Sequence, residues 1–237
     1  MNFMNEPKSS TRDLRARIEG LLRSEEFEER LSEWPRFPAR RVINPLFSFF
    51  YSPDELLKMR AVKAAGIVVT GAAKEDIEFA RVVMRRLIWN LNDESGGIGW
   101  GSPEAMGEIM AMHERIAREY VHILVSYIDK KGNPLEHEGL EEGVLWGIGR
   151  LAQVRPHLLR GAGPHVIRYL ASENPVLRGT AAWVIGMLKA GEARPALKNL
   201  LGDRAEVILF RHGSLDRCRV GELAKEALES LDRERRA

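Results

Sequence analysis

The chain of 237 residues is 44% hydrophobic and 30% charged, which is ordinary for a globular protein with a sizeable core. Its formal net charge of +2 is too small to indicate nucleic-acid binding by itself. The single cysteine, Cys218, excludes an intramolecular disulfide. The polar N-terminus lacks the apolar core of a signal peptide, and no apolar run is long enough to span a bilayer, so a cytoplasmic protein is expected.

The N-terminal region is expected to be a disordered lead followed by a helical cap. Residues 1–10 are polar and form the expected lead. From Thr11, a candidate N-cap, apolar residues recur at the spacing of an amphipathic helix. A second short helix is expected before Pro35 and Pro38 break the pattern. Residues 11–43 are therefore interpreted as an N-terminal helical cap.

Proline and acidic residues predict where later helices begin. Residues 52–55 (SPDE) and 102–104 (SPE) each combine an N-cap, a proline in the first turn and acids that complement the helix dipole. A short helix is expected over residues 46–51, after an Asn-Pro pair. Residues 205–210 are β-branched and apolar, and fit an extended segment against the last helix pair. Helical spacing predicts the other helices over residues 74–91, 102–128, 135–154, 163–171, 175–188, 193–201 and 215–231.

The second half of the chain contains an internal repeat. The segments 140–149 (LEEGVLWGIG), 177–186 (LRGTAAWVIG) and 220–229 (VGELAKEALE) align without gaps, so that Trp146 matches Trp183. Their starts lie about 40 residues apart, a period typical of α-solenoids. Each helix pair of a solenoid leaves an apolar face that only a neighbouring pair can cover. The repeat therefore predicts a stack of helix pairs.

Residues 177–203 resemble the inner helix, turn and next outer helix of HEAT repeats, and are most similar to the short bacterial kind also found in phycobilin lyases. The residues on that pattern are Arg178, Ala181, Ala182, Ile185, Gly186, Pro195, Ala196 and Leu200. The resemblance is strongest over residues 136–231. It implies an all-α, right-handed superhelix with a concave inner surface, and it implies no activity. We interpret the chain as one domain over residues 11–231, with first repeats at 44–91, an atypical loop and helix at 92–128, regular repeats at 135–231, and a charged tail at 232–237.

The stretch from Trp89 to His113 differs from the rest of the chain. Four glycines within residues 96–101 precede a helix N-terminus, an arrangement that can hold an anion. However, a helix precedes them where a dinucleotide fingerprint requires a strand. Acids also flank the glycines, which favours a cation or a basic partner: Asp93, Glu94, Glu104 and Glu108.

Two interpretations of this stretch remain open. In a structural role, Asp93 and Ser95 cap turns, Glu104 complements the helix dipole, and the tryptophans fill the core. In a recognition role, the loop contacts a ligand, because a structural connection rarely needs two tryptophans and four glycines. Trp100 is then the aromatic anchor. The candidate binding residues are Trp89, Asn92, Asp93, Glu94, Trp100, Glu104, Met106, Glu108 and Trp146.

Patterns for metal binding and catalysis are weak. His113 and His122 are nine residues apart, which places them on opposite sides of a straight helix, and no HExxH motif is present. His137 lies at a helix start, where its acidic neighbour is expected anyway. Cys218 lies between two arginines, but nothing in the sequence pairs it with a base. We therefore expect no metal, no cofactor and no catalytic residue.

The tryptophans of the repeat and the arginines of several helices allow further interpretations. Trp146 and Trp183 occupy equivalent positions, where they form either an aromatic ladder on the concave face or, as we favour, part of the core. Arginines cluster on several helices, as in solenoids that bind nucleic acid, but 34 acidic residues are interleaved among the basic ones.

The leading prediction is a non-catalytic protein that binds a protein or peptide partner on its concave face, with residues 89–108 providing specificity. The alternative is a small-molecule binder or an enzyme whose pocket is walled by the same loop. Nucleic-acid binding is the third interpretation. A closed pocket of roughly a few hundred Å³ favours a small ligand, and an open groove favours a partner chain.

Overall fold

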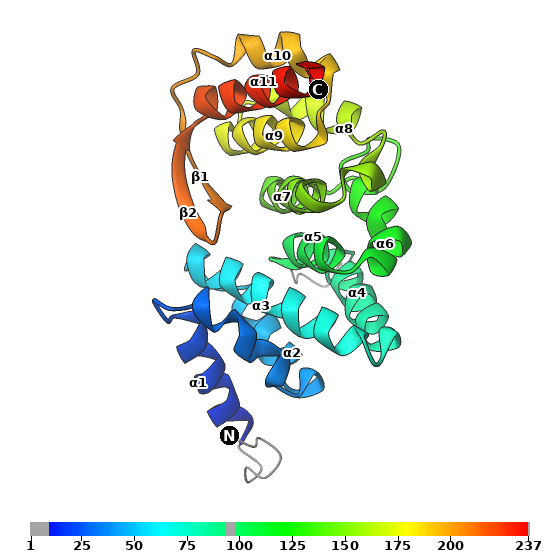
Figure 1. The fold of residues 1–237 in the computed structure, drawn as a ribbon, viewed down its shortest axis with the longest axis vertical. Coiled ribbons are helices and arrows are strands. Elements are labelled where there is room, and N and C mark those ends of the chain that lie inside the picture. The colour runs from blue at the N-terminus through cyan, green and yellow to red at the C-terminus, as the bar shows by residue number, and fades with distance from the viewer. Residues whose placement is uncertain (1–9, 93–97, 237) are drawn as a thin grey trace.

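A computed structural model describes residues 10–92 and 98–236, which form a curved stack of helices (Figure 1). The inner layer consists of α3 (Glu55–Ala73), α5 (Ser102–Met112), α7 (Glu138–Val154), α9 (Pro175–Leu188) and α11 (Val220–Arg236). The outer layer consists of α4 (Ile77–Leu91), α6 (Glu114–Ser126), α8 (Gly163–Ile167) and α10 (Arg194–Asn199). This architecture confirms the predicted all-α solenoid.

The remaining elements close the ends of the stack and connect its layers. The N-terminal end is formed by α1 (Thr11–Leu22), the 3-10 helix η2 (Glu29–Arg36) and α2 (Ala39–Phe49). Three short 3-10 helices lie in the connections between inner and outer helices. They are η3 (Pro156–Leu159) between α7 and α8, η4 (Arg168–Ala171) between α8 and α9, and η5 (Gly191–Ala193) between α9 and α10. Within residues 10–92 and 98–236, no helix has the length and apolar character needed to cross a bilayer.

The helix α5 is buried on all sides, because α3, α7, α4 and α6 surround it. Every residue from Ser102 to Ala111 is buried, including two glutamates. Although its sequence does not match the repeat, α5 takes a regular inner position, and α6 the outer position beside it. The helix predicted over residues 102–128 is interrupted at His113, which has an extended backbone and caps α6 through its Nδ1.

Glycines allow the inner helices to approach each other closely where α5 crosses α7. A Cβ atom placed on Gly107 would lie 2.3 Å from the Cα of Gly147. This distance is far below van der Waals contact, and the atom that it meets is main chain. The absence of side chains at this crossing therefore sets the spacing between α5 and α7.

Two predictions for the N-terminal end of the chain were wrong. Ser10, and not Thr11, caps α1, because its hydroxyl accepts the Asp13 N–H while the Asp13 carboxylate accepts the Ser10 N–H. In addition, α2 begins at Ala39 and continues through Pro45 instead of starting after it. Proline removes one helical hydrogen bond, but α2 buries a continuous apolar stripe against α1 and α3 that stabilises it.

A β-hairpin crosses the concave side of the stack (Figure 1). Its strands, β1 (Glu206–Arg211) and β2 (Ser214–Arg219), pair in antiparallel register from Glu206 opposite Arg219 to Arg211 opposite Ser214. The extended conformation predicted for residues 205–210 is confirmed. The helix predicted from residue 215 begins instead at Val220, because residues 214–219 pair with β1 and satisfy its backbone groups.

The two-residue turn of the hairpin depends on positive φ angles, which are 55° at His212 and 83° at Gly213. We expect Gly213→Ala to destabilise the protein by about 1 kcal/mol, because a Cβ disfavours this left-handed conformation. The added Cβ would also meet the Glu28 carboxylate, whose Oε1 lies 2.5 Å from that position. Thermal unfolding measures the change. The control is Gly202→Ala, which has open space around it; equal losses in both variants would contradict the prediction.

Candidate binding cleft

A cavity of about 570 Å³ lies between the hairpin and the inner helices. One wall is formed by residues 206–210 of β1 together with Leu215 and Arg217 of β2. The opposite wall comes from α3, α5, α7 and α9, whose lining residues are Glu55, Met59, Glu104, Glu142, Gly143, Trp146, Val176 and Thr180. The cleft therefore combines an apolar surface with carboxylates on the concave side of the stack.

A second cavity of about 320 Å³ adjoins the first. Trp146 and Phe210 line both cavities and separate them, because the Trp146 Nε1–H donates to the Phe210 carbonyl oxygen at 2.8 Å. In the second cavity Glu108 accepts from Arg150, with 2.6 Å between Nε and Oε2. We call the first cavity the acidic chamber and the second the paired chamber, since its Glu108 already has a cationic partner.

The acidic chamber contains carboxylates that are only partly compensated. Lys58 lies 2.9 Å from Glu55 Oε1 and 3.4 Å from Glu104 Oε1. Glu104 is only 5% exposed, and its Oε2 has no hydrogen-bond partner among the described residues. This carboxylate lies against Gly143, where a Cβ would be 2.6 Å from Oε2. Within the described part of the chain, Glu142 has neither a hydrogen bond nor an ion pair, so carboxyl groups outnumber cationic groups around the chamber.

Burial and mutual repulsion alter the ionisation of this cluster. Burial, reinforced by the Glu104 charge, raises the pKa of Glu142 from 4.5 to about 7. Burial also raises the pKa of Glu104, against the opposing attraction of Lys58. For Lys58, burial lowers the pKa, but attraction by Glu104 and Glu55 raises it overall. Lys58 therefore remains charged, while Glu142 is poised to bind or release a proton near neutral pH.

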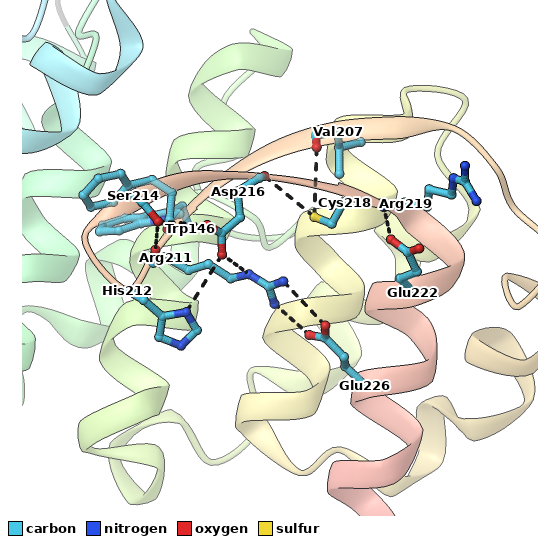
Figure 2. Close-up of polar contacts among 11 residues, drawn as sticks. Trp146, Val207, Arg211, His212, Ser214, Asp216, Cys218, Arg219, Glu222 and Glu226 are labelled. Atoms are coloured by element: carbon cyan, nitrogen blue, oxygen red, sulfur yellow. Dashed lines mark hydrogen bonds and ion pairs between the residues drawn. The ribbon is translucent and has the colours of Figure 1, made fainter.

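Ion pairs hold the hairpin in place (Figure 2). Arg211 donates from Nε to Asp216 at 2.9 Å and from Nη1 to Glu226 of α11 at 2.7 Å. The Ser214 hydroxyl also donates to Asp216 at 2.8 Å, and this bond together with Arg211 lowers the pKa of the Asp216 carboxyl. The hairpin is thus fixed to α11 by Arg211 and to α7 through the Trp146 bond.

The structure places the candidate residues from the sequence in different environments. Glu104 and Trp146 line the acidic chamber, and Glu108 lines the paired chamber. Met106 is buried in the core, and Trp89 is 72% exposed on the outer helix α4.

The described loop residues Asn92 and Trp100 do not line the acidic chamber. Trp100 packs edge-on against His137 at the start of α7, with 4.9 Å between the ring centroids. Asn92 donates to Tyr127 at 3.4 Å and accepts from Asn133 at 3.0 Å. Asp93 and Glu94, together with Ser95, Gly96 and Gly97, lie outside the described residues.

Sequence reasoning missed Glu142, Glu55 and the strand β1 as parts of the site. One signal was available for Glu142: it lies four residues before Trp146 in the repeated segment 140–149, and therefore on the same helix face. No comparable signal marked β1, because its proximity to the inner helices depends on how the hairpin folds back across them.

The structure also describes the surroundings of the cysteine, of the groups that could bind a metal, and of the arginines that the sequence singled out. Cys218 is buried in β2, and burial raises the pKa of its thiol. No three His, Cys, Asp or Glu side chains within residues 10–92 and 98–236 are arranged to hold a metal ion. Arginines of the outer helices pair with acids, as Arg81 does with Glu119.

We compared the sequence of the chain with known protein families and with known proteins. No protein-family model matches the chain. An uncharacterised protein of Archaeoglobus fulgidus is 33% identical over 125 residues, and this match spans 53% of the present chain and 60% of that protein.

Designed helical-repeat proteins share the architecture. A designed armadillo repeat protein covers 91% of this chain and 98% of its own, with 17% identity and a TM-score of 0.50. A designed armadillo repeat protein in complex with the peptide (KR)4 has the same coverage and identity and a TM-score of 0.51. An engineered protein covers 93% of this chain and 97% of its own, with 16% identity and a TM-score of 0.52. The chain therefore has an armadillo-like helical-repeat fold.

Proposed function

We propose that the chain is a non-catalytic binding protein that holds a basic segment of a partner protein in its concave cleft. The observation that carries this proposal is the acidic chamber, an open and otherwise apolar cavity lined by the buried Glu104, the half-buried Glu142 and the exposed Glu55, which lack full compensation. A buried carboxylate without a partner is costly, and a cation that enters the chamber removes that cost.

The charges of the described lining residues support a cationic ligand. Glu206 and Arg217 pair at 3.1 Å and compensate each other at the edge of the hairpin. Lys58 lies close to Glu55, Glu104 and Glu142, so one ammonium group compensates three carboxyl groups. A lysine or arginine side chain would supply the missing positive charge while its aliphatic stem packs on Met59 and Trp146. The same charge disfavours a phosphate backbone.

A second candidate function is the binding of a small organic cation. The volume of about 570 Å³ supports it, because small-molecule sites typically measure roughly 300–1,000 Å³. Both candidates use the same recognition chemistry and differ in what carries the cation.

We infer further that the repeats are of the HEAT type, on the basis of the match over residues 177–203. The cytoplasmic location remains a prediction.

A selection from a library of short linear peptides tests the proposed function. We expect peptides enriched in lysine or arginine to be retained by the wild-type protein. This enrichment should disappear in the double variant Glu55→Gln, Glu142→Gln, which keeps the side-chain shapes and removes two charges. The matched control is Glu75→Gln, Glu173→Gln, since both residues are exposed and lie outside the cleft. The proposal fails if no peptide is retained, or if the double variant selects the same basic peptides as the wild type.

A further inference from the structure

The register of the hairpin identifies which backbone groups of β1 point away from β2. The Val220 N–H donates to the Ala205 carbonyl at 3.0 Å, and this pair continues the register of Glu206 opposite Arg219. Because hydrogen-bonded and non-hydrogen-bonded pairs alternate in antiparallel strands, the odd-numbered residues of β1 bond to β2. The N–H and C=O groups of Glu206, Ile208 and Phe210 therefore lie on the opposite edge of the strand.

This free edge faces the acidic chamber. The Phe210 carbonyl accepts from Trp146 of α7, so the edge points toward the inner helices. Residues 206–210 line the chamber without a gap, whereas β2 contributes Leu215 and Arg217, so β1 is the strand nearer to the inner helices. Ile208 is 50% exposed, and no group outside the hairpin, within the described residues, hydrogen-bonds to its N–H or C=O.

The two edges of the hairpin also differ in composition. The outward-pointing side chains of β2 include Arg217 and Arg219, and charged residues of this kind protect a free edge from unwanted pairing. On β1 the exposed residues are Glu206, which pairs with Arg217, and the aliphatic Ile208. This less protected strand lines the acidic chamber together with Glu55, Glu104 and Glu142.

We infer that a basic, extended segment of a partner binds as a third β-strand along the free edge of β1 and places a lysine or arginine side chain among Glu55, Glu104 and Glu142. Backbone hydrogen bonds to Ile208 then provide affinity that does not depend on sequence, and the carboxylates provide selectivity. The inference rests on the proposed function and specifies how the cleft holds its ligand.

Amide hydrogen exchange tests this binding mode directly. The probe is a blocked peptide of alternating lysine and valine, whose binding to the full chain is followed by calorimetry. We expect the peptide to slow exchange of the Ile208 amide, while the Leu209 amide, already bonded to β2, changes little. Binding without protection of Ile208 overturns the strand-addition mode but leaves the proposed function intact. Failure of this peptide to bind also overturns the mode, and the library selection then decides the proposed function separately.

A proline substitution provides the second test. Proline is tolerated on a free strand edge but has no N–H to donate, so Ile208→Pro should weaken peptide binding about fivefold, the effect of roughly one hydrogen bond. The comparison variant, Ile208→Thr, also changes the side chain but keeps the N–H, so it should lose less affinity than the proline variant. A comparison of melting temperatures reports whether the hairpin remains folded. Equal affinities for the proline and threonine variants, both folded, would overturn the inference.

Discussion

Replacement of Gly107 by alanine is expected to destabilise the protein by about 2 to 3 kcal/mol, the usual cost of an overpacked contact. The new methyl group would lie 2.3 Å from the Gly147 Cα, so α5 and α7 would have to move apart. Within a helix, alanine is more favourable than glycine by about 1 kcal/mol, and the stated loss of stability already includes this gain. Because α5 is packed on all sides, a shift at this crossing would disturb α3 as well.

Equilibrium unfolding in urea measures this effect. The matched control is Gly20→Ala in α1, where a Cβ meets no atom within 4 Å and alanine should be neutral or slightly stabilising. An unfolding midpoint for Gly107→Ala equal to that of the wild type would show that the two helices tolerate a wider spacing.

Affinity for the lysine–valine peptide is expected to rise about tenfold between about pH 6 and about pH 8, as a carboxyl group with a pKa of about 7 passes from mostly protonated to mostly ionised. Only the ionised Glu142 attracts a bound cation. The other charged groups that face it are Glu104, Glu55 and Lys58 across the chamber, and the Glu206–Arg217 pair on the hairpin. Protonation of Glu104, whose pKa burial also raises, acts in the same direction.

Calorimetry across this pH range tests the prediction, with Glu142→Gln as the control. The glutamine variant should bind more weakly at high pH and show a much smaller dependence on pH. Proton release on binding, measured in buffers of different ionisation enthalpy, should accompany binding near neutral pH in the wild type. An affinity that is independent of pH, or the same pH dependence in Glu142→Gln, would exclude Glu142 as the group responsible.

In the absence of a bound cation, Glu142 acts on stability in the opposite sense. Its pKa in the native state, about 7, is higher than the ordinary value of 4.5, so the native state binds its proton more tightly than the unfolded state does. The free energy of unfolding therefore contains a contribution that is present below pH 4.5 and is lost as the pH rises from 4.5 to about 7. Recognition of a cation and stability of the empty cleft thus depend on pH in opposite directions.

The solenoid could be predicted because the helix pair that repeats in the structure also appears as a repeat in the sequence. Trp146 and Trp183 occupy matching positions in α7 and α9, where both are largely buried and also line cavities on the concave side. The repeat pattern does not extend to α5, whose buried face includes Glu104 and Glu108. Its place in the inner layer follows from packing on all sides, which periodicity alone does not reveal.

The candidate site was only partly predictable, for a topological reason. Glu104 was singled out because of its acidic neighbours in sequence, whereas its neighbours in space, Lys58 and Glu142, come from the adjacent inner helices. Pairing of Glu108 with Arg150 joins residues 42 positions apart. Each inner helix from α3 to α9 contributes between one and three residues to the same cavity, so the site becomes apparent only when the repeats are stacked.

The hairpin connects the two ends of the array. It emerges from the C-terminal repeats, and its tip at Gly213 meets Glu28 of the N-terminal cap, which is itself bonded to Lys63 of α3. An open solenoid can change its curvature by small rotations between neighbouring repeats. Here a change in curvature must stretch or compress the span between α11 and Glu28. We therefore expect the width of the cleft to change together with the curvature of the stack.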